Sequence, residues 1–106
     1  MRSPRFRIET REGQRAFVVA VHGELDLAAL PELQEVLDVA ERSDVPEIVV
    51  DLGGLTFVDS SGVNALIQLH QRIALSDQRL TILHGHPRIW RVFELAGLTT
   101  TLPFLP

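Results

Sequence analysis

Residues 47–75 read EIVVDLGGLTFVDSSGVNALIQLHQRIAL and join a strand pattern to a helix pattern. The β-branched run Ile48-Val49-Val50 lies within Glu47 to Leu52, and a short run of this kind is typical of a strand that is buried on both faces. After Asp59-Ser60-Ser61-Gly62, one face recurs at helical spacing, and the helix is expected to end between Leu75 and Asp77. The residues of this face are Val63, Leu66, Ile67, His70 and Ile73. A buried strand that leads into an amphipathic helix favours an α/β fold.

A hairpin and a helix are predicted upstream of this segment. Apolar residues alternate between Arg5 and Glu9 and run together from Phe17 to Val21, and the stretch Thr10 to Gln14 between them contains a glycine. This pattern indicates two strands joined by a turn. After Gly23-Glu24-Leu25-Asp26 the apolar residues take helical spacing, so we expect an amphipathic helix that ends near Arg42.

A strand, a helix and a last strand are predicted downstream. Arg79 to Leu83 has the composition of a strand, Pro87 begins a third helical pattern, and Gly97 closes it. We expect Thr99 to Leu102 to form a final strand. The predicted order is therefore β-β-α-β-α-β-α-β in a single domain of residues 1–106. An alternating order of this kind gives right-handed crossovers and a small mixed, mostly parallel sheet with amphipathic helices packed on it.

The composition excludes several classes of function. The chain of 106 residues suits one compact domain, and the absence of Cys rules out disulfides and thiolate catalysis. The formal net charge is -4, and the ten basic residues are all Arg and are scattered, so a basic face for direct binding to nucleic acid is not expected. No apolar stretch approaches the roughly 20 residues needed to cross a bilayer. We therefore expect a cytoplasmic protein that does not insert into membranes.

The segment Leu55 to Gly62 places two hydroxyl groups and a carboxylate where an apolar stretch meets a helix N-terminus. A helix start exposes unpaired N–H groups, and Ser or Asp side chains commonly accept hydrogen bonds from them as caps. A phosphate on Ser60 is the functional alternative. It would meet the positive end of the helix, while it would place about -1.5 to -2 of extra charge beside Asp59. The residues by themselves leave capping and modification both open.

Three segments together give the chain a family resemblance. They are Gly23-Glu24-Leu25-Asp26, Phe57-Val58-Asp59-Ser60-Ser61-Gly62 and Arg91-Val92-Phe93-Glu94-Leu95-Ala96-Gly97-Leu98. With these segments in this order and spacing, the chain resembles the STAS domain family, specifically the bacterial anti-anti-sigma factors (anti-sigma factor antagonists). The resemblance extends over nearly the whole chain and implies the STAS fold. It also implies that Ser60, which directly follows the Asp of the Asp-Ser-Ser-Gly motif, is phosphorylated by a partner that is both an anti-sigma factor and a Ser kinase.

The resemblance implies a partner switch. The unmodified protein would bind the kinase and free a sigma factor, phosphorylation of Ser60 would release it, and a Ser/Thr protein phosphatase would restore it. Asp59 would position Ser60 and contact the kinase, and Asp26 would line the same face, although an ordinary cap of the turn after Asp26 fits the sequence equally well. Ser61 and Gly62 complete the expected partner-binding set, Ser61 as a helix cap and Gly62 by leaving room for the partner beside the backbone. The kinase would bring ATP, and the protein itself would need no cofactor.

Two departures from the family pattern bear on these expectations. Where relatives commonly carry Gly-Leu-Gly after the Ser pair, the chain has Gly62-Val63-Asn64, so a bulkier and more polar surface is expected just past Ser60. This difference bears on which kinase recognises the protein, and less on the mechanism of the switch. The sequence also stops at Pro106 without the final helix that many members place after the last strand. Either that helix is dispensable or a partner covers its place.

An enzyme would need a fuller set of groups than the sequence provides. Ser60 could act as a nucleophile with Asp59 and with a base from the four histidines, which are His22, His70, His84 and His86. The sequence lacks a Gly-x-Ser-x-Gly elbow, and the absence of Lys excludes a Schiff base or a phosphate-loop lysine. His84 and His86 are possible zinc ligands, but two ligands do not make a site. We therefore expect neither catalysis nor a bound metal.

Binding without a switch is the alternative function. STAS subunits also occur as partners of lipid ABC transporters and in stressosome-like assemblies, and such a subunit would need no sigma factor. The intact Asp59-Ser60-Ser61-Gly62 favours the sigma-factor pathway.

Trp90 and Phe93 are expected in the core, whereas Phe57 and Phe104 could be buried or could serve as exposed docking anchors.

Overall fold

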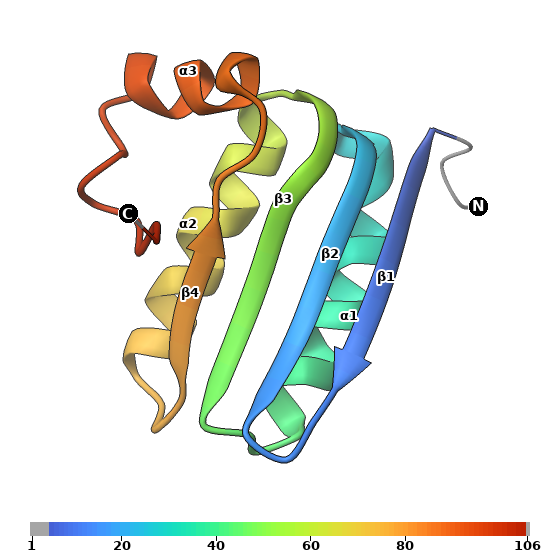
Figure 1. Cartoon of the computed structure of the whole chain (residues 1–106), viewed down its shortest axis with the longest axis vertical. Helices are drawn as coiled ribbons and strands as arrows, with labels where there is room; N and C mark the ends of the chain where they lie inside the picture. Colours follow the sequence, from blue (N-terminus) through green and yellow to red (C-terminus); the bar gives the residue numbers. More distant parts are fainter. Residues whose placement is uncertain (1–4, 106) are drawn as a thin grey trace.

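Four strands form one sheet, in the spatial order β1-β2-β3-β4 (Figure 1). The computed structural model describes residues 5–105, so both ends of the predicted 1–106 domain lie outside the described part. The strands are β1 (Phe6–Glu12), β2 (Ala16–Leu25), β3 (Glu47–Val58) and β4 (Arg79–Leu83). β1 pairs antiparallel with β2, while the β2–β3 and β3–β4 pairs are parallel. The predicted mixed, mostly parallel sheet is therefore confirmed.

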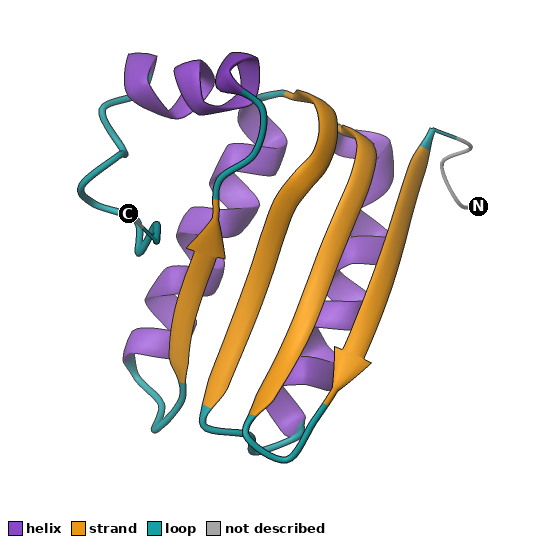
Figure 2. Ribbon diagram, in the orientation of Figure 1, coloured by secondary structure: helices purple, strands orange, loops and turns teal. Residues whose placement is uncertain are grey.

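Two helices cover one face of the sheet, and a third lies at its end (Figures 1 and 2). They are α1 (Leu30–Arg42), α2 (Ser60–Ala74) and α3 (Pro87–Leu95), and a short 3-10 helix, η1 (Leu27–Ala29), precedes α1. The chain crosses the sheet in one direction, from β2 to β3 to β4, so two right-handed crossovers place α1 and α2 on the same face. The chain turns after α3 at Gly97, which has a φ of 72°, as the sequence predicts.

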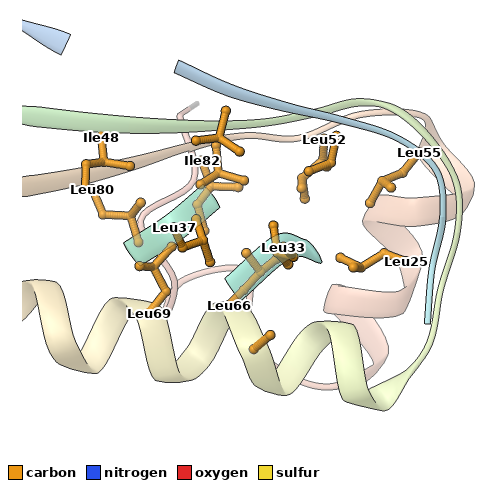
Figure 3. Packing of buried hydrophobic residues seen from close by; sticks show 14 of the residues in the cluster. Leu25, Leu33, Leu37, Ile48, Leu52, Leu55, Leu66, Leu69, Leu80 and Ile82 are labelled. Carbon is orange, nitrogen blue, oxygen red and sulfur yellow. The ribbon is translucent and has the colours of Figure 1, made fainter. Parts of the chain in front are cut away.

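The core lies between the sheet and the layer formed by α1 and α2 (Figure 3). Leu33 and Leu37 of α1 and Leu66 and Leu69 of α2 are fully buried there. Buried and half-buried side chains alternate along β2 as far as His22 and along the first half of β3, which is the pattern of strands with one covered face. The expectation that the strand at Ile48 is buried on both faces is therefore wrong. Both crossover helices lie on the same side, and the opposite side stays half-buried.

The predicted final strand, Thr99 to Leu102, forms a turn instead. The backbone of this segment is tied to the end of α3, since the Leu102 N–H donates a hydrogen bond to the Leu98 carbonyl at 3.0 Å. A later residue takes the place beside β4, where Phe104 forms an isolated parallel bridge with Ile82. The described residues thus have the order β-β-α-β-α-β-α, with a bridge where the sequence predicts a fifth strand.

Aromatic rings hold this last segment against α3. Phe93 is fully buried, as predicted, but Trp90 is only half-buried. The Trp90 ring lies 4.5 Å from the His84 ring and 4.9 Å from the Phe104 ring, measured between centroids. Phe104 also contacts Phe93, with a centroid distance of 5.1 Å. Phe104 is therefore a packing residue, and the prediction that Trp90 lies in the core holds only for part of its surface.

Candidate functional site

The carboxyl ends of β2 and β3 emerge side by side at one edge of the sheet. The two strands are parallel, and Leu25 at the end of β2 is in register with Val58 at the end of β3. The Asp59 N–H donates a hydrogen bond to the Leu25 carbonyl at 3.2 Å. This bond connects the residue that follows β3 to the last residue of β2. This pairing places Asp26 and Asp59 at the same edge, where η1 and α2 begin.

Asp59 is the N-cap of α2. Its Oδ1 accepts hydrogen bonds from the Ser61 N–H at 3.0 Å, from the Gly62 N–H at 3.2 Å and from the Ser61 hydroxyl at 2.5 Å. The hydroxyl of Ser61, supported by the two N–H groups, holds the pKa of Asp59 below its ordinary value of 3.8, although partial burial acts in the opposite direction. Asp59 is therefore an anchored carboxylate, ionised at neutral pH.

The two serines of the motif have different surroundings. Ser60 is exposed at the first position of α2, and within residues 5–105 its hydroxyl has no hydrogen-bond partner. The Ser61 hydroxyl donates to Asp59 and is partly buried. The expectation that Ser61 caps the helix is wrong, because Asp59 occupies the capping position and Ser61 supports it from the first turn. Of these two serines, Ser60 is the one whose hydroxyl is exposed and makes no hydrogen bond within residues 5–105.

Asp26 has the geometry of an ordinary cap. Its side chain accepts a hydrogen bond from the Ala29 N–H at 3.1 Å and begins η1. The capping interpretation of Asp26 is thus the one that the geometry shows, and a contact between Asp26 and a partner stays a prediction. The half-buried position of Asp26 at the same edge as Asp59 is compatible with both roles.

Gly62 is a packing residue. A Cβ atom at this position would lie 2.7 Å from Cγ of Leu25 and 2.9 Å from Cγ2 of Val58, so only glycine lets the first turn of α2 approach the ends of the two strands. Gly62 is buried, and the side chains of Leu25 and Val58 occupy the space in which the sequence predicts the approach of a partner. We therefore assign Gly62 to packing beneath the site, not to the partner-contacting surface.

The histidines do not complete a catalytic group. The Nε2 atom of His22 lies 2.9 Å from Oε1 of Glu9, and His86 caps the start of α3. Within residues 5–105, no histidine forms a hydrogen bond with Ser60 or Asp59, and no three His, Asp or Glu side chains gather to hold a metal ion. No helix in this part of the chain is long and apolar enough to span a bilayer.

Two apolar residues at this edge were not assigned from the sequence. Leu27, in η1, is 70% exposed, and Phe57, near the end of β3, is 47% exposed. The sequence leaves Phe57 undecided between core and surface and gives Leu27 no role. A signal for Leu27 exists, because it directly follows the capping Asp26 and falls outside the apolar stripe of α1.

Loss of the Asp59 cap should destabilise the protein in a pH-dependent way. Asp59→Ala is expected to lower the free energy of unfolding by about 1 kcal/mol at about pH 7, because three hydrogen bonds at the start of α2 are lost. The pKa of Asp59 is lowered in the folded state, so its stabilising effect is present above pH 3.8 and disappears as the pH falls through the folded pKa. Urea unfolding followed by circular dichroism at about pH 7 and about pH 3 measures both effects.

The matched control for this experiment is Asp59→Asn, which keeps a good capping side chain without the charge. It should lose less stability than Asp59→Ala at neutral pH. A difference between wild type and Asp59→Ala that stays the same at both pH values would contradict a role for the ionised carboxylate.

The sequence matches the STAS domain family over residues 7–106. It is also similar to an anti-sigma-B factor antagonist of Staphylococcus aureus (strain NCTC 8325 / PS 47). The two sequences are 35% identical over 91 residues, which cover 86% of this chain and 84% of the relative.

The fold is similar to solved structures of anti-sigma factor antagonists. One from Mycobacterium paratuberculosis superposes with a TM-score of 0.86 at 23% identity and covers 100% of this chain and 91% of that chain. SpoIIAA in its unphosphorylated form gives a TM-score of 0.75 at 25% identity, with 94% and 85% coverage. The phosphorylated form of Bacillus SpoIIAA gives 0.69 at 25% identity, with 94% and 88% coverage. The resemblance seen in the sequence is thereby confirmed, and the chain belongs to the STAS domain family.

Proposed function

We propose that this chain is a single-domain anti-sigma factor antagonist of the cytoplasm, switched by phosphorylation of Ser60. The unphosphorylated form binds an anti-sigma factor that is also a Ser kinase, and a sigma factor is freed. The observation that carries the proposal is the exposed Ser60 hydroxyl, which has no hydrogen-bond partner among residues 5–105 and lies beside the anchored Asp59. It occurs in a chain that is 35% identical to an anti-sigma-B factor antagonist.

The surroundings of the two serines support Ser60 as the acceptor. The Ser60 oxygen attacks the γ-phosphorus of ATP held by the kinase, the bond from that phosphorus to the oxygen that leaves with ADP breaks, and the hydroxyl proton passes to a base. Asp59 is a poor base because its pKa is lowered and its Oδ1 already accepts three hydrogen bonds. The base therefore comes from the kinase, and Asp59 acts as a positioning residue that fixes the first turn of α2.

Phosphorylation changes the charge of the surface more than the fold. A phosphate on Ser60 adds about -1.5 to -2 of charge at the helix N-terminus, where the helix dipole favours an anion. The neighbouring Asp59 carboxylate repels the phosphate. In an interface with the kinase, the same charge would have to be desolvated next to Asp59, and this cost drives release. A Ser/Thr protein phosphatase hydrolyses the phosphoester and restores binding.

The other parts of the proposal follow from the same surface. The protein itself is not an enzyme, and its partner-binding surface comprises Asp26, Asp59 and Ser60, with Ser61 in support. It acts on transcription without direct contact with nucleic acid, in keeping with a net charge of -4 and ten scattered Arg residues. A non-switching partner subunit of a lipid ABC transporter or a stressosome-like assembly is not favoured, since the similar proteins are named anti-sigma factor antagonists.

Phosphorylation in vitro tests the proposal. The wild-type chain is incubated with ATP and each candidate anti-sigma Ser kinase encoded in the same genome, and mass spectrometry locates any phosphate. We expect one phosphate on Ser60, none on Ser60→Ala and one on the control Ser61→Ala, whose Ser60 hydroxyl is intact. Phosphate on Ser61 alone would show that Ser61, and not Ser60, is the phosphorylation site. No phosphate with any candidate kinase would contradict the switch.

A further inference from the structure

Two large apolar side chains are exposed at the sheet edge that presents Ser60. Leu27 is 70% exposed and Phe57 is 47% exposed, while their chain neighbours Leu25 and Val58 are buried. Single exposed apolar residues are common on protein surfaces and need no explanation. Two of them beside the proposed modification site, one just past the end of β2 and one near the end of β3, are a candidate docking surface.

The backbone fixes both residues relative to Ser60. Leu25 and Val58 are partners in the register of β2 and β3. Leu27 lies two residues after Leu25, and Ser60 lies two residues after Val58. The hydrogen bond from the Asp59 N–H to the Leu25 carbonyl keeps the two strand ends together. Leu27 is further held by the Asp26 cap at the start of η1. Phe57 precedes Ser60 by three residues on β3 and is paired with Glu24 of β2.

Leu27 contributes little to the stability of the fold, and Phe57 contributes through the half of its surface that is buried. Burial of a Leu or Phe side chain stabilises a protein only in proportion to the apolar area removed from water. Leu27 keeps most of its surface in water, and Phe57 keeps about half of its surface there. Their apolar surface can be removed from water by a partner that covers this edge.

We propose, on the basis of the function proposed above, that Leu27 and Phe57 are the apolar anchors by which the Ser60 kinase holds this protein. A kinase that reaches the Ser60 hydroxyl buries a surface of about 800 Å² on each partner in an interface of standard size. Because the ends of β2 and β3 are held together beside Ser60, we expect a surface of that size to include Leu27 and Phe57. The carboxylates of Asp26 and Asp59 lie at the same edge, so the occupant is a kinase surface with an apolar pocket and a basic rim.

Matched alanine variants test this inference. Leu27→Ala and Phe57→Ala are each expected to weaken binding of the purified Ser60 kinase by about tenfold or more. In phosphorylation assays they should raise the KM for this protein and leave kcat unchanged, because the Ser60 hydroxyl and its cap are intact. The control is Leu75→Ala, since Leu75 is 91% exposed at the opposite end of α2, about 22 Å from Ser60 along the helix. It should change neither quantity by more than about twofold.

The possible outcomes separate this inference from the proposed function. If wild type is phosphorylated on Ser60 but Leu27→Ala and Phe57→Ala bind the kinase as Leu75→Ala does, the anchors are refuted and the switch stands. If no kinase binds or phosphorylates wild type, the switch and the anchors both fail. If light scattering shows that Leu27→Ala converts a dimer to a monomer at unchanged kinase affinity, the surface joins two copies of this chain and the inference is overturned. Equal thermal unfolding of the variants and wild type shows that affinity changes do not come from unfolding.

Discussion

Ser60→Asp should weaken binding to the kinase by more than about tenfold, whereas Ser60→Ala should keep the affinity of the unphosphorylated protein within about twofold. Alanine removes only a hydroxyl group that has no partner in the described residues. Aspartate places a second carboxylate beside Asp59, in the centre of the proposed interface. Burial of a charge without a matching partner costs about 2 to 5 kcal/mol, and about 1.4 kcal/mol corresponds to a tenfold change in affinity.

Isothermal titration calorimetry of the purified kinase with each variant measures this effect. Ser60→Asn has nearly the shape of the aspartate variant without its charge and separates steric from electrostatic effects. Gln68→Asp adds the same charge at an exposed position two turns further along α2 and tests whether net charge alone matters. Equal affinities for Ser60→Asp and Ser60→Ala would show that charge is not the release signal. Equal losses in Ser60→Asp and Gln68→Asp would indicate a long-range effect.

Much of the fold can be predicted from the sequence because its signals are local. The helical stripe after Asp59-Ser60-Ser61-Gly62 correctly gives α2, and the spacing up to Arg42 correctly gives α1. The position of Thr99 to Leu102 depends on tertiary contacts instead. Its apolar and β-branched residues suit a strand, but the hydrogen bonds that decide its structure run to the end of α3. The one-sided burial of β3 likewise depends on which face both crossover helices occupy, and one strand's composition does not reveal that.

The candidate site shows the same division between local and tertiary information. The sequence locates Ser60 at a helix start, and the structure adds that the Ser61 hydroxyl is engaged by Asp59 and the Ser60 hydroxyl is not. No spacing rule distinguishes two adjacent serines, because the difference lies in side-chain geometry. The role of Gly62 is likewise set by a tertiary contact, since it depends on Leu25, a residue 37 positions earlier in the chain.

Leu25→Ala should lower the free energy of unfolding by about 2 to 5 kcal/mol, the range for a buried leucine whose removal leaves a cavity. Leu25 has 0% relative exposure and lies where the end of β2 meets the start of α2 (Figure 3). Its backbone carbonyl still accepts the Asp59 N–H in the variant, so the loss measures side-chain packing. Urea unfolding gives the value, and Leu27→Ala, two residues later but exposed, should change stability by less than about 0.5 kcal/mol.

A double-mutant cycle with Gly62→Ala tests the cause of this packing. Gly62→Ala alone should destabilise the protein by about 1 to 3 kcal/mol, because its Cβ would lie 2.7 Å from Leu25 Cγ. In the Leu25→Ala background the contact with Leu25 is absent and the contact with Val58 Cγ2 at 2.9 Å remains, so the double variant should be more stable than the sum of the single losses predicts. The expected coupling is at least about 0.5 kcal/mol, and additive losses would contradict the contact.

Because the same contact seats the first turn of α2, Leu25→Ala should also lower the rate of Ser60 phosphorylation under conditions where the variant stays folded.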